Sequence, residues 1–206
     1  MRLRIWPVLA LLLLINSCKT TAPAGSKQTA DPYISQVDSV LALMTLDEKI
    51  GQMTIFTTDW ESTGPTIREG YQNDIRNGSC GALFNSHTVA FTRKLQEIAV
   101  KESRLGIPLL FGYDVIHGYK TIFPIPLGES CSWDLAAIEQ SAAIAAAESA
   151  AAGLHWTFAP MVDISREPRW GRVMEGAGED PYLGSLIARA RVHGFQGDNF
   201  NGTDRI

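Results

Sequence analysis

Short apolar runs alternate along this chain with segments whose apolar residues recur every three or four positions. The apolar, β-prone runs predict strands over residues 53–56, 81–84, 107–111 and 155–159. Helical spacing or a high content of helix-forming residues predicts helices over 32–44, 67–77, 88–103, 135–152 and 183–195. The chain therefore has the strand–helix alternation that is typical of an α/β protein with a parallel sheet.

Helix start and stop signals support several of these boundaries. Residues 45–48 (TLDE) form a capping-box pattern, so we expect one more short helix to begin there and to end near Gly51. Asp134 is a suitable N-cap for the alanine-rich helix over 135–152, and Gly153 is well placed to end it.

The number of strand–helix units bounds the architecture. About four units are visible, and the chain ends at Ile206, just after the last predicted helix. A (β/α)₈ barrel needs eight strands and typically ~250 residues. The sequence therefore predicts a partial TIM-type barrel over residues 32–206, about the first half of such a domain.

Charge makes nucleic acid an unexpected partner. The chain has 206 residues, of which 45% are hydrophobic, with 18 Lys and Arg against 22 Asp and Glu, a formal net charge of −4. A nucleic-acid-binding protein concentrates positive charge on one face, and no basic run is present here.

The N-terminal residues resemble a bacterial export signal. Arg2 and Arg4 precede an apolar stretch over 5–15 that is too short to span a bilayer as a helix, and Cys18 follows Ile15 in a lipobox-like sequence (INSC). We expect residues 1–18 to be a lipoprotein signal ending at the lipidated Cys18. The alternative is an ordinary secretory signal with an incidental cysteine.

A polar tract over 19–31 follows and is predicted to be a flexible tether. Together with the lipid it would hold the domain at a membrane surface, in the periplasm or at the outer membrane. The remaining cysteines, Cys80 and Cys131, could form a disulfide in an exported protein or remain as two buried thiols. No Cys/His cluster has metal-ligand spacing, so no metal site is expected.

Residues 112–118 (GYDVIHG) place an acidic side chain directly after a predicted buried strand. In a barrel this is the end of the strand where functional groups lie, so Asp114 is a candidate acceptor of hydrogen bonds from a ligand. The alternatives are structural: Asp114 caps a turn, and His117 is a histidine with its hydrogen bonds satisfied.

Residues 166–175 (REPRWGRVME) combine three arginines, a tryptophan and two glutamates. Guanidinium groups suit hydroxyls and carboxylates, and an aromatic ring suits the apolar face of a sugar. The alternative is a surface loop held by its own ion pairs. Residues 176–182 (GAGEDPY) are better explained as a turn that leads into the last helix.

At these residues the chain resembles glycoside hydrolase family 3, in its β-glucosidase and exo-glucanase branch. The resemblance rests on residues 112–118, on 168–172 (PRWGR) and on 179–182 (EDPY), in this order, on the upstream segment 44–53 (MTLDEKIGQM) and on residues 130–134 (SCSWD). It covers roughly residues 34–195.

The resemblance implies a barrel-type N-terminal domain followed by a second α/β domain, and hydrolysis of terminal β-linked glucosyl residues without a cofactor. Asp114 matches the family's aspartate that holds hydroxyls of the sugar in subsite −1, and Arg172 matches the arginine that donates to the same sugar. Arg169, Trp170 and Glu175 fall in the same motif and are expected to support the site.

No catalytic pair is assigned in this chain. A retaining glycosidase uses two carboxyl groups about 5–5.5 Å apart, as nucleophile and acid/base. The family's nucleophile lies in a Ser-Asp-Trp-like motif after a Lys-His pair, and neither is found in residues 1–206. The acid/base of the family usually lies in the second domain.

We therefore expect a β-glucosidase-like enzyme in which these residues bind a β-linked oligosaccharide or glucoside, while the C-terminal half of the barrel and the second domain complete the machinery. By itself the chain is expected to be inactive. The alternatives are a non-catalytic, glycan-binding lipoprotein at the cell surface, and a β-xylosidase or N-acetylhexosaminidase of the same family.

Overall fold

A computed structural model describes residues 31–61, 64–68, 70–198 and 202–206. The predicted signal over 1–18, with Cys18, and nearly all of the predicted tether over 19–31 lie outside the described residues. The chain divides into two units, residues 1–43 and 44–206. In the first unit the helix α2 (Ile34–Leu43) confirms the helix predicted over 32–44.

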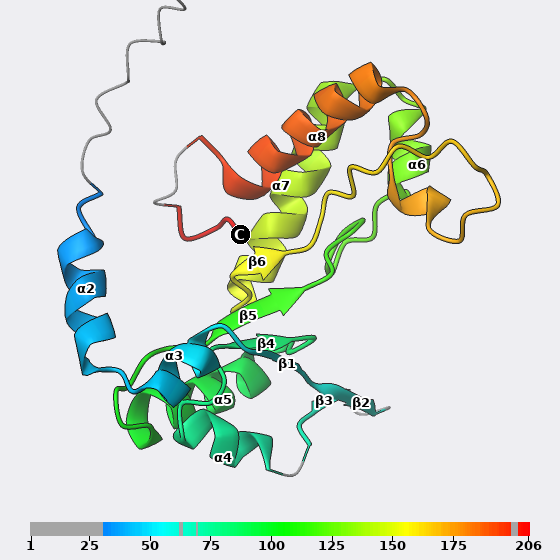
Figure 1. Ribbon diagram of the computed structural model, residues 1–206. Helices are drawn as coiled ribbons and strands as arrows, with labels where there is room; N and C mark the ends of the chain where they lie inside the picture. Colours follow the sequence, from blue (N-terminus) through cyan, green and yellow to red (C-terminus); the bar gives the residue numbers. More distant parts are fainter. Residues whose placement is uncertain (1–30, 62–63, 69, 199–201) are drawn as a thin grey trace, which may run out of the picture. The chain divides into compact units, whose positions relative to one another are not determined.

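A four-stranded parallel sheet organises the second unit (Figure 1). Its strands are β1 (Ile55–Thr57), β4 (Ala82–Phe84), β5 (Leu110–Tyr113) and β6 (Trp156–Thr157), hydrogen-bonded in the order β1-β4-β5-β6. Parallel neighbours in sequence order are the arrangement found along one side of a (β/α)₈ barrel. The predicted α/β class and parallel sheet are thus confirmed.

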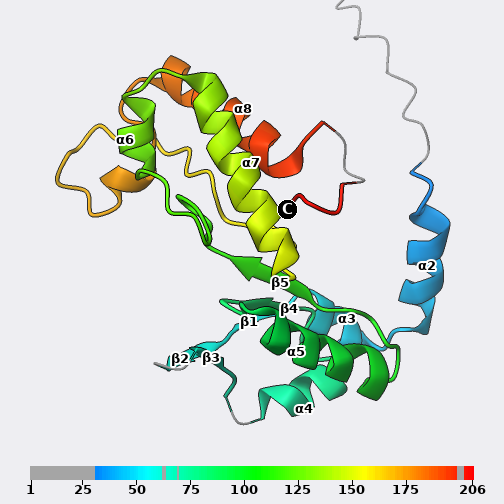
Figure 2. The same ribbon diagram turned by 180° about the vertical axis from the view of Figure 1, so that it is seen from behind.

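One side of this sheet carries the larger hydrophobic core. The helices α3 (Leu46–Gln52), α4 (Tyr71–Arg76) and α5 (Val89–Glu102) gather there, as the view from behind in Figure 2 also shows. The core is made of buried apolar side chains from the strands, from α4 and α5, and from their connections: Ile75, Cys80, Leu83, Leu95, Ile98, Ala99, Leu109, Phe111 and Leu154.

The helices α7 (Leu135–Ala151) and α8 (Pro181–Gln196) lie side by side. As predicted, the side chain of Asp134 caps α7, accepting from the Ala137 amide at 3.0 Å, and Gly153, with φ of 86°, follows its end. Asp180 caps α8 in the same way, so residues 176–182 do lead into this helix. Small side chains on α7 let α8 approach closely.

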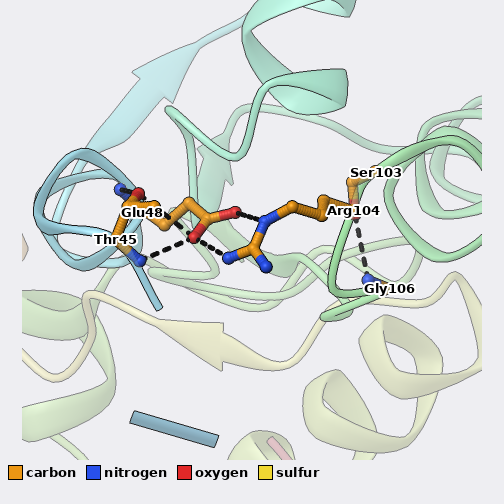
Figure 3. Close-up of polar contacts among 5 residues, drawn as sticks. All are labelled: Thr45, Glu48, Ser103, Arg104 and Gly106. Atoms are coloured by element: carbon orange, nitrogen blue, oxygen red, sulfur yellow. Dashed lines mark hydrogen bonds and ion pairs between the residues drawn. The ribbon is translucent and has the colours of Figure 1, made fainter. Parts of the chain in front are cut away.

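The capping box over 45–48 is present and is part of a larger ionic contact (Figure 3). The Glu48 carboxylate accepts from the Thr45 amide at 2.8 Å, and the Glu48 amide donates to Thr45 Oγ1 at 3.2 Å. Arg104 donates to both oxygens of the same carboxylate, with Nε to Oε1 at 2.9 Å. This guanidinium, helped by the Thr45 amide, lowers the pKa of Glu48 to about 2. The start of α3 is therefore tied to the segment that precedes β5.

Several predicted boundaries are wrong, for local reasons. The strand expected over 107–111 is β5 at 110–113, because Pro108 has no N–H for the ladder and the first amide to pair is that of Leu110. The helix expected over 67–77 begins only at Tyr71, after Gly70 with φ of 98°. The strand expected over 155–159 is reduced to two residues.

Three features of the described chain were not predicted. A hairpin of β2 (Asp59–Glu61) and β3 (Gly64–Thr66) lies in the polar stretch after β1. A short helix, α6 (Pro126–Ser130), and a 3₁₀ turn, η1 (Val173–Glu175), lie in the two long connections that follow β5 and β6. All three are too short to produce a periodic pattern.

The two cysteines within the described residues are not paired. Cys80 is buried and Cys131 is exposed, and both are free thiols. The disulfide left open by the sequence is therefore not formed, and only one of the two thiols is buried. In the described part of the chain no helix has the length and apolar character needed to cross a membrane. The same residues contain no group of three or more His, Cys, Asp or Glu placed to hold a metal ion.

Candidate functional site

Asp114 lies where β5 ends, at the carboxyl edge of the sheet. Its neighbour Val115 is fully buried, and the Val115 amide donates to Thr157 Oγ1 at 3.1 Å, so the backbone turns there and Asp114 is left exposed to solvent. The Asp114 side chain therefore has room to meet a ligand. It comes from the strand end at which barrel enzymes place functional groups.

Arg172 and Glu175 form an ion pair at η1. Arg172 donates from Nε to Glu175 Oε1 at 2.9 Å and from Nη2 to Oε2 at 2.6 Å, a bidentate contact. The Glu175 side chain is 21% exposed and that of Arg172 is 60% exposed. Arg172 lowers the pKa of Glu175, and Glu175 raises the pKa of Arg172. The carboxylate orients a guanidinium that still faces solvent.

The charges of these three residues act on one another. Desolvation by the surrounding chain raises the pKa of Asp114, the negative charge of Glu175 raises it further, and the positive charge of Arg172 opposes both. The negative charges of Asp114 and, more weakly, of Asp163 also raise the pKa of Arg172. The structure thus brings Asp114, Arg172 and Glu175 from two separate connections into one electrostatic neighbourhood. A carboxylate acceptor and a guanidinium donor in one neighbourhood can bind the hydroxyl groups of a polyol or sugar.

Arg169 and Trp170 are placed differently. Arg169 pairs with Glu167, with Nε to Oε1 at 2.8 Å and Nη2 to Oε2 at 2.9 Å, and both side chains are exposed. Trp170 is exposed on the same loop. Within the described residues no hydrogen bond or ion pair joins either of them to Asp114. The loop does form its own ion pairs, as its structural interpretation predicted, and one of these orients Arg172.

The structural interpretation of His117 is supported: its Nδ1 lies 3.0 Å from the carbonyl oxygen of Phe123. Thr157 was missed by sequence reasoning. Its hydroxyl oxygen accepts from the amides of Val115 and Ala159, at 3.1 and 3.2 Å, and so joins the ends of β5 and β6 below Asp114. No local signal marks this threonine, because its role depends on the pairing of two strands.

Several known proteins with similar sequences and structures are β-glucosidases, and two β-xylosidases of Formosa agariphila are also similar in sequence. The chain is 45% identical over 161 residues to the periplasmic β-glucosidase of Salmonella typhimurium, an alignment that covers 78% of this chain and 20% of that protein. It is similar to the crystal structure of β-glucosidase from Listeria innocua, with a TM-score of 0.75 and 37% identity over 84% of this chain and 25% of that one. The complex of that enzyme with glucose gives a TM-score of 0.74 and 38% identity over the same shares of the two chains.

The chain spans about a fifth to a quarter of the length of these relatives. A sequence profile of the glycosyl hydrolase family 3 N-terminal domain matches residues 45–204, which include the whole parallel sheet, α3 to α8 and the residues around Asp114. The match covers most of the chain and supports the resemblance first seen in its motifs. The chain belongs to glycosyl hydrolase family 3.

Proposed function

We propose that this chain supplies the sugar-binding part of a β-glucosidase. Ionised Asp114 accepts hydrogen bonds from hydroxyls of the terminal glucosyl unit in subsite −1, and Arg172 donates to the same sugar. The observation that carries the proposal is the electrostatic neighbourhood of Asp114, Arg172 and Glu175 at the carboxyl edge of the sheet. The similar enzyme from Listeria innocua, crystallised in complex with glucose, supports the same class of ligand.

Within this proposal Glu175 orients Arg172, and Arg169 and Trp170 border the site from the exposed part of the loop. Hydrolysis with retention needs a nucleophile and an acid/base carboxyl group. The proposal assigns neither task to residues 1–206 and requires no cofactor. The partners of this site are a β-linked oligosaccharide or glucoside and the parts of the protein that carry the catalytic pair.

The test uses the protein expressed from its gene, with whatever sequence follows Ile206, and aryl β-D-glucoside as substrate. We expect D114N to lower kcat/KM about ten- to a hundredfold, because a hydrogen bond to a charged group contributes about 1.5–3 kcal/mol. D38N in α2, a change of the same kind on an exposed aspartate, is the matched control and should leave the rate unchanged. Undiminished hydrolysis by D114N would refute the proposed site.

The same assay distinguishes the alternatives. Faster hydrolysis of an aryl β-xyloside or N-acetylglucosaminide than of the glucoside would assign another activity of the family. Sugar binding that depends on Asp114 without any hydrolysis would support a glycan-binding protein. The pKa of Asp114 is raised, and only its ionised carboxylate can accept hydrogen bonds at both oxygens. As the pH is lowered, sugar binding should therefore weaken at a higher pH than it would for a site with an ordinary aspartate.

We also propose that the protein is exported and anchored by lipid at Cys18, with the domain beginning near residue 32. The sequence of residues 1–18 and the periplasmic relative support export. Mass spectrometry of the N-terminal peptide and detergent partitioning test the anchor. C18S should move the protein from the membrane fraction to the soluble fraction, and an unmodified Cys18 in the mature wild type would contradict the proposal.

A further inference from the structure

The least exposed ion pair in the described chain lies behind the candidate site. Arg191, on α8, has a side chain only 4% exposed, and its partner Glu129, on α6, is 9% exposed. Their Nη2 and Oε2 atoms are 2.5 Å apart. The motif analysis singled out neither residue. The contact fixes α8 against α6 across 62 residues of sequence.

The second arm of the same guanidinium holds the connection that carries Asp114. Arg191 Nη1 donates to the backbone carbonyl of Ile116 at 2.7 Å, two residues after Asp114. The preceding amide, of Val115, is held by Thr157. The segment over 114–118 is therefore fixed from the sheet at one residue and from α8 at the next. Without Arg191 the Ile116 carbonyl loses this anchor.

The ion pair also reaches the Arg172 side of the site. Glu129 belongs to α6, and α6 packs against η1, the turn that presents the pair of Arg172 and Glu175. Arg191 and Glu175 line the same small cavity, together with Gly176 and Ala177. One buried cation thus contacts the Asp114 segment directly and the Arg172 segment through α6.

Stability alone explains this arrangement poorly. Burying a guanidinium costs free energy, and apolar side chains of similar volume often replace a buried ion pair without loss. Arg191 Nε is buried and has no acceptor within the described chain, so the cation is not even fully satisfied. What an apolar pair cannot supply is the hydrogen bond to the Ile116 carbonyl.

We propose that Arg191, held in place by Glu129, is a positioning residue that keeps Asp114 in register with Arg172 for the sugar. The effect on catalysis rests on the proposed function. The geometry rests on the contacts of Arg191 with Glu129 and with Ile116, and on the packing of α6 against η1. It adds to the site a residue that touches no substrate.

The test is the double variant R191M/E129L, which removes the hydrogen bond to Ile116 but leaves no unpaired charge. Its control is R104M, which breaks the ion pair of Figure 3 in the segment that precedes β5, whereas Asp114 follows that strand. Four quantities are compared with the wild type: Tm, hydrogen exchange of the peptide containing 114–118, and both KM and kcat for aryl β-glucoside.

We expect R191M/E129L to keep Tm within about 4 °C of the wild type, which corresponds to about 1 kcal/mol. Exchange in 114–118 should become faster, and KM should rise about tenfold, the effect of misplacing one charge-assisted hydrogen bond. R104M should lower Tm with KM and the exchange of 114–118 unchanged. A purely structural role would lower the active fraction and hence the apparent kcat, but leave KM as it is.

Unchanged exchange and unchanged KM in the double variant, with the fold retained, would overturn the proposal. If the double variant does not fold, R191K is measured in its place. The lysine keeps a cation beside Glu129 but cannot donate to both the Glu129 carboxylate and the Ile116 carbonyl, so the same changes in KM and exchange are expected. If the wild type neither binds nor hydrolyses a β-glucoside, the proposed function fails. Faster exchange in 114–118 then still supports the anchor, and unchanged exchange refutes it.

Discussion

The contact between α7 and α8 offers a sharp test of the packing described above. At Gly194 of α8 an added Cβ would lie 2.3 Å from the carbonyl oxygen of Glu139 and 2.6 Å from Cβ of Ala142, both on α7. Ordinary contacts of this kind are about 3.5–4 Å. Backbone and alanine atoms cannot rotate away, so G194A must push the two helices apart.

Two effects of opposite sign determine the size of the change. Alanine is favoured over glycine in a helix by about 1 kcal/mol, and overpacking a well-filled contact costs typically about 1–3 kcal/mol. Because the overlap exceeds 1 Å against backbone, we take the upper end, which leaves a net loss of about 2 kcal/mol in the free energy of unfolding. For a domain of this size the Tm should fall by about 4–8 °C.

Gly184 in the same helix is the matched control. Outside its own helix, a Cβ there would meet no heavy atom of the described chain within 4 Å. G184A therefore gains only the higher helix propensity of alanine over glycine and should raise the Tm by about 2–4 °C. Both variants are measured by circular dichroism at 222 nm during heating. If G194A is as stable as the wild type, or gains like G184A, then α7 and α8 are not in the contact described.

Two predictions concern acid stability. Arg104 lowers the pKa of Glu48 to about 2 from 4.5, so the stabilisation of the fold by ionised Glu48 is complete above pH 4.5 and is lost as the pH falls towards 2. The difference in Tm between the wild type and E48Q should shrink over that range. A difference that stays constant would contradict the assignment. Desolvation of the ring, which stacks on Phe111, lowers the pKa of His155, and its Nδ1 accepts from the Phe111 amide at 2.9 Å. The neutral ring therefore stabilises the fold above pH 6.5, and this contribution is lost as the pH falls below that value. H155N keeps an acceptor without titrating, and its urea midpoint should fall less than that of the wild type between pH 7.5 and 5; equal falls would refute the role of this ring.

The parts of the fold that the sequence predicted depend on neighbouring residues. The caps at Thr45, Asp134 and Asp180 act within three or four positions, so a local pattern is enough to place the helices that follow them. The predicted strands were located less well. Pro108 moved the start of β5, and the two-residue β6 was predicted as a longer run, because strand ends depend on where a neighbouring strand offers partners.

The candidate site divides in the same way. Its motif residues, and the resemblance that assigns Asp114 and Arg172 to sugar binding, could be read from the printed chain. The pairing of Arg172 with Glu175 is also local, three residues apart in a turn. The sequence could not predict that Arg169 pairs with Glu167 and has no described hydrogen bond to Asp114. Arg169 and Arg172 each have a glutamate nearby in sequence, so a local pattern does not tell which of the two faces the site.

By itself the sequence determined the class of fold, the parallel order of short strands and the segments that carry chemistry, since propensity, periodicity and capping act over a few residues. Tertiary structure alone decided that Asp114 lies close enough to Arg172 for their charges to interact, and that Arg191 holds Ile116 and Glu129, from 75 and 62 residues away. Such contacts form only when the strands are paired in register and α8 is packed against α7. They depend on the packing of the whole second unit rather than on any segment of it.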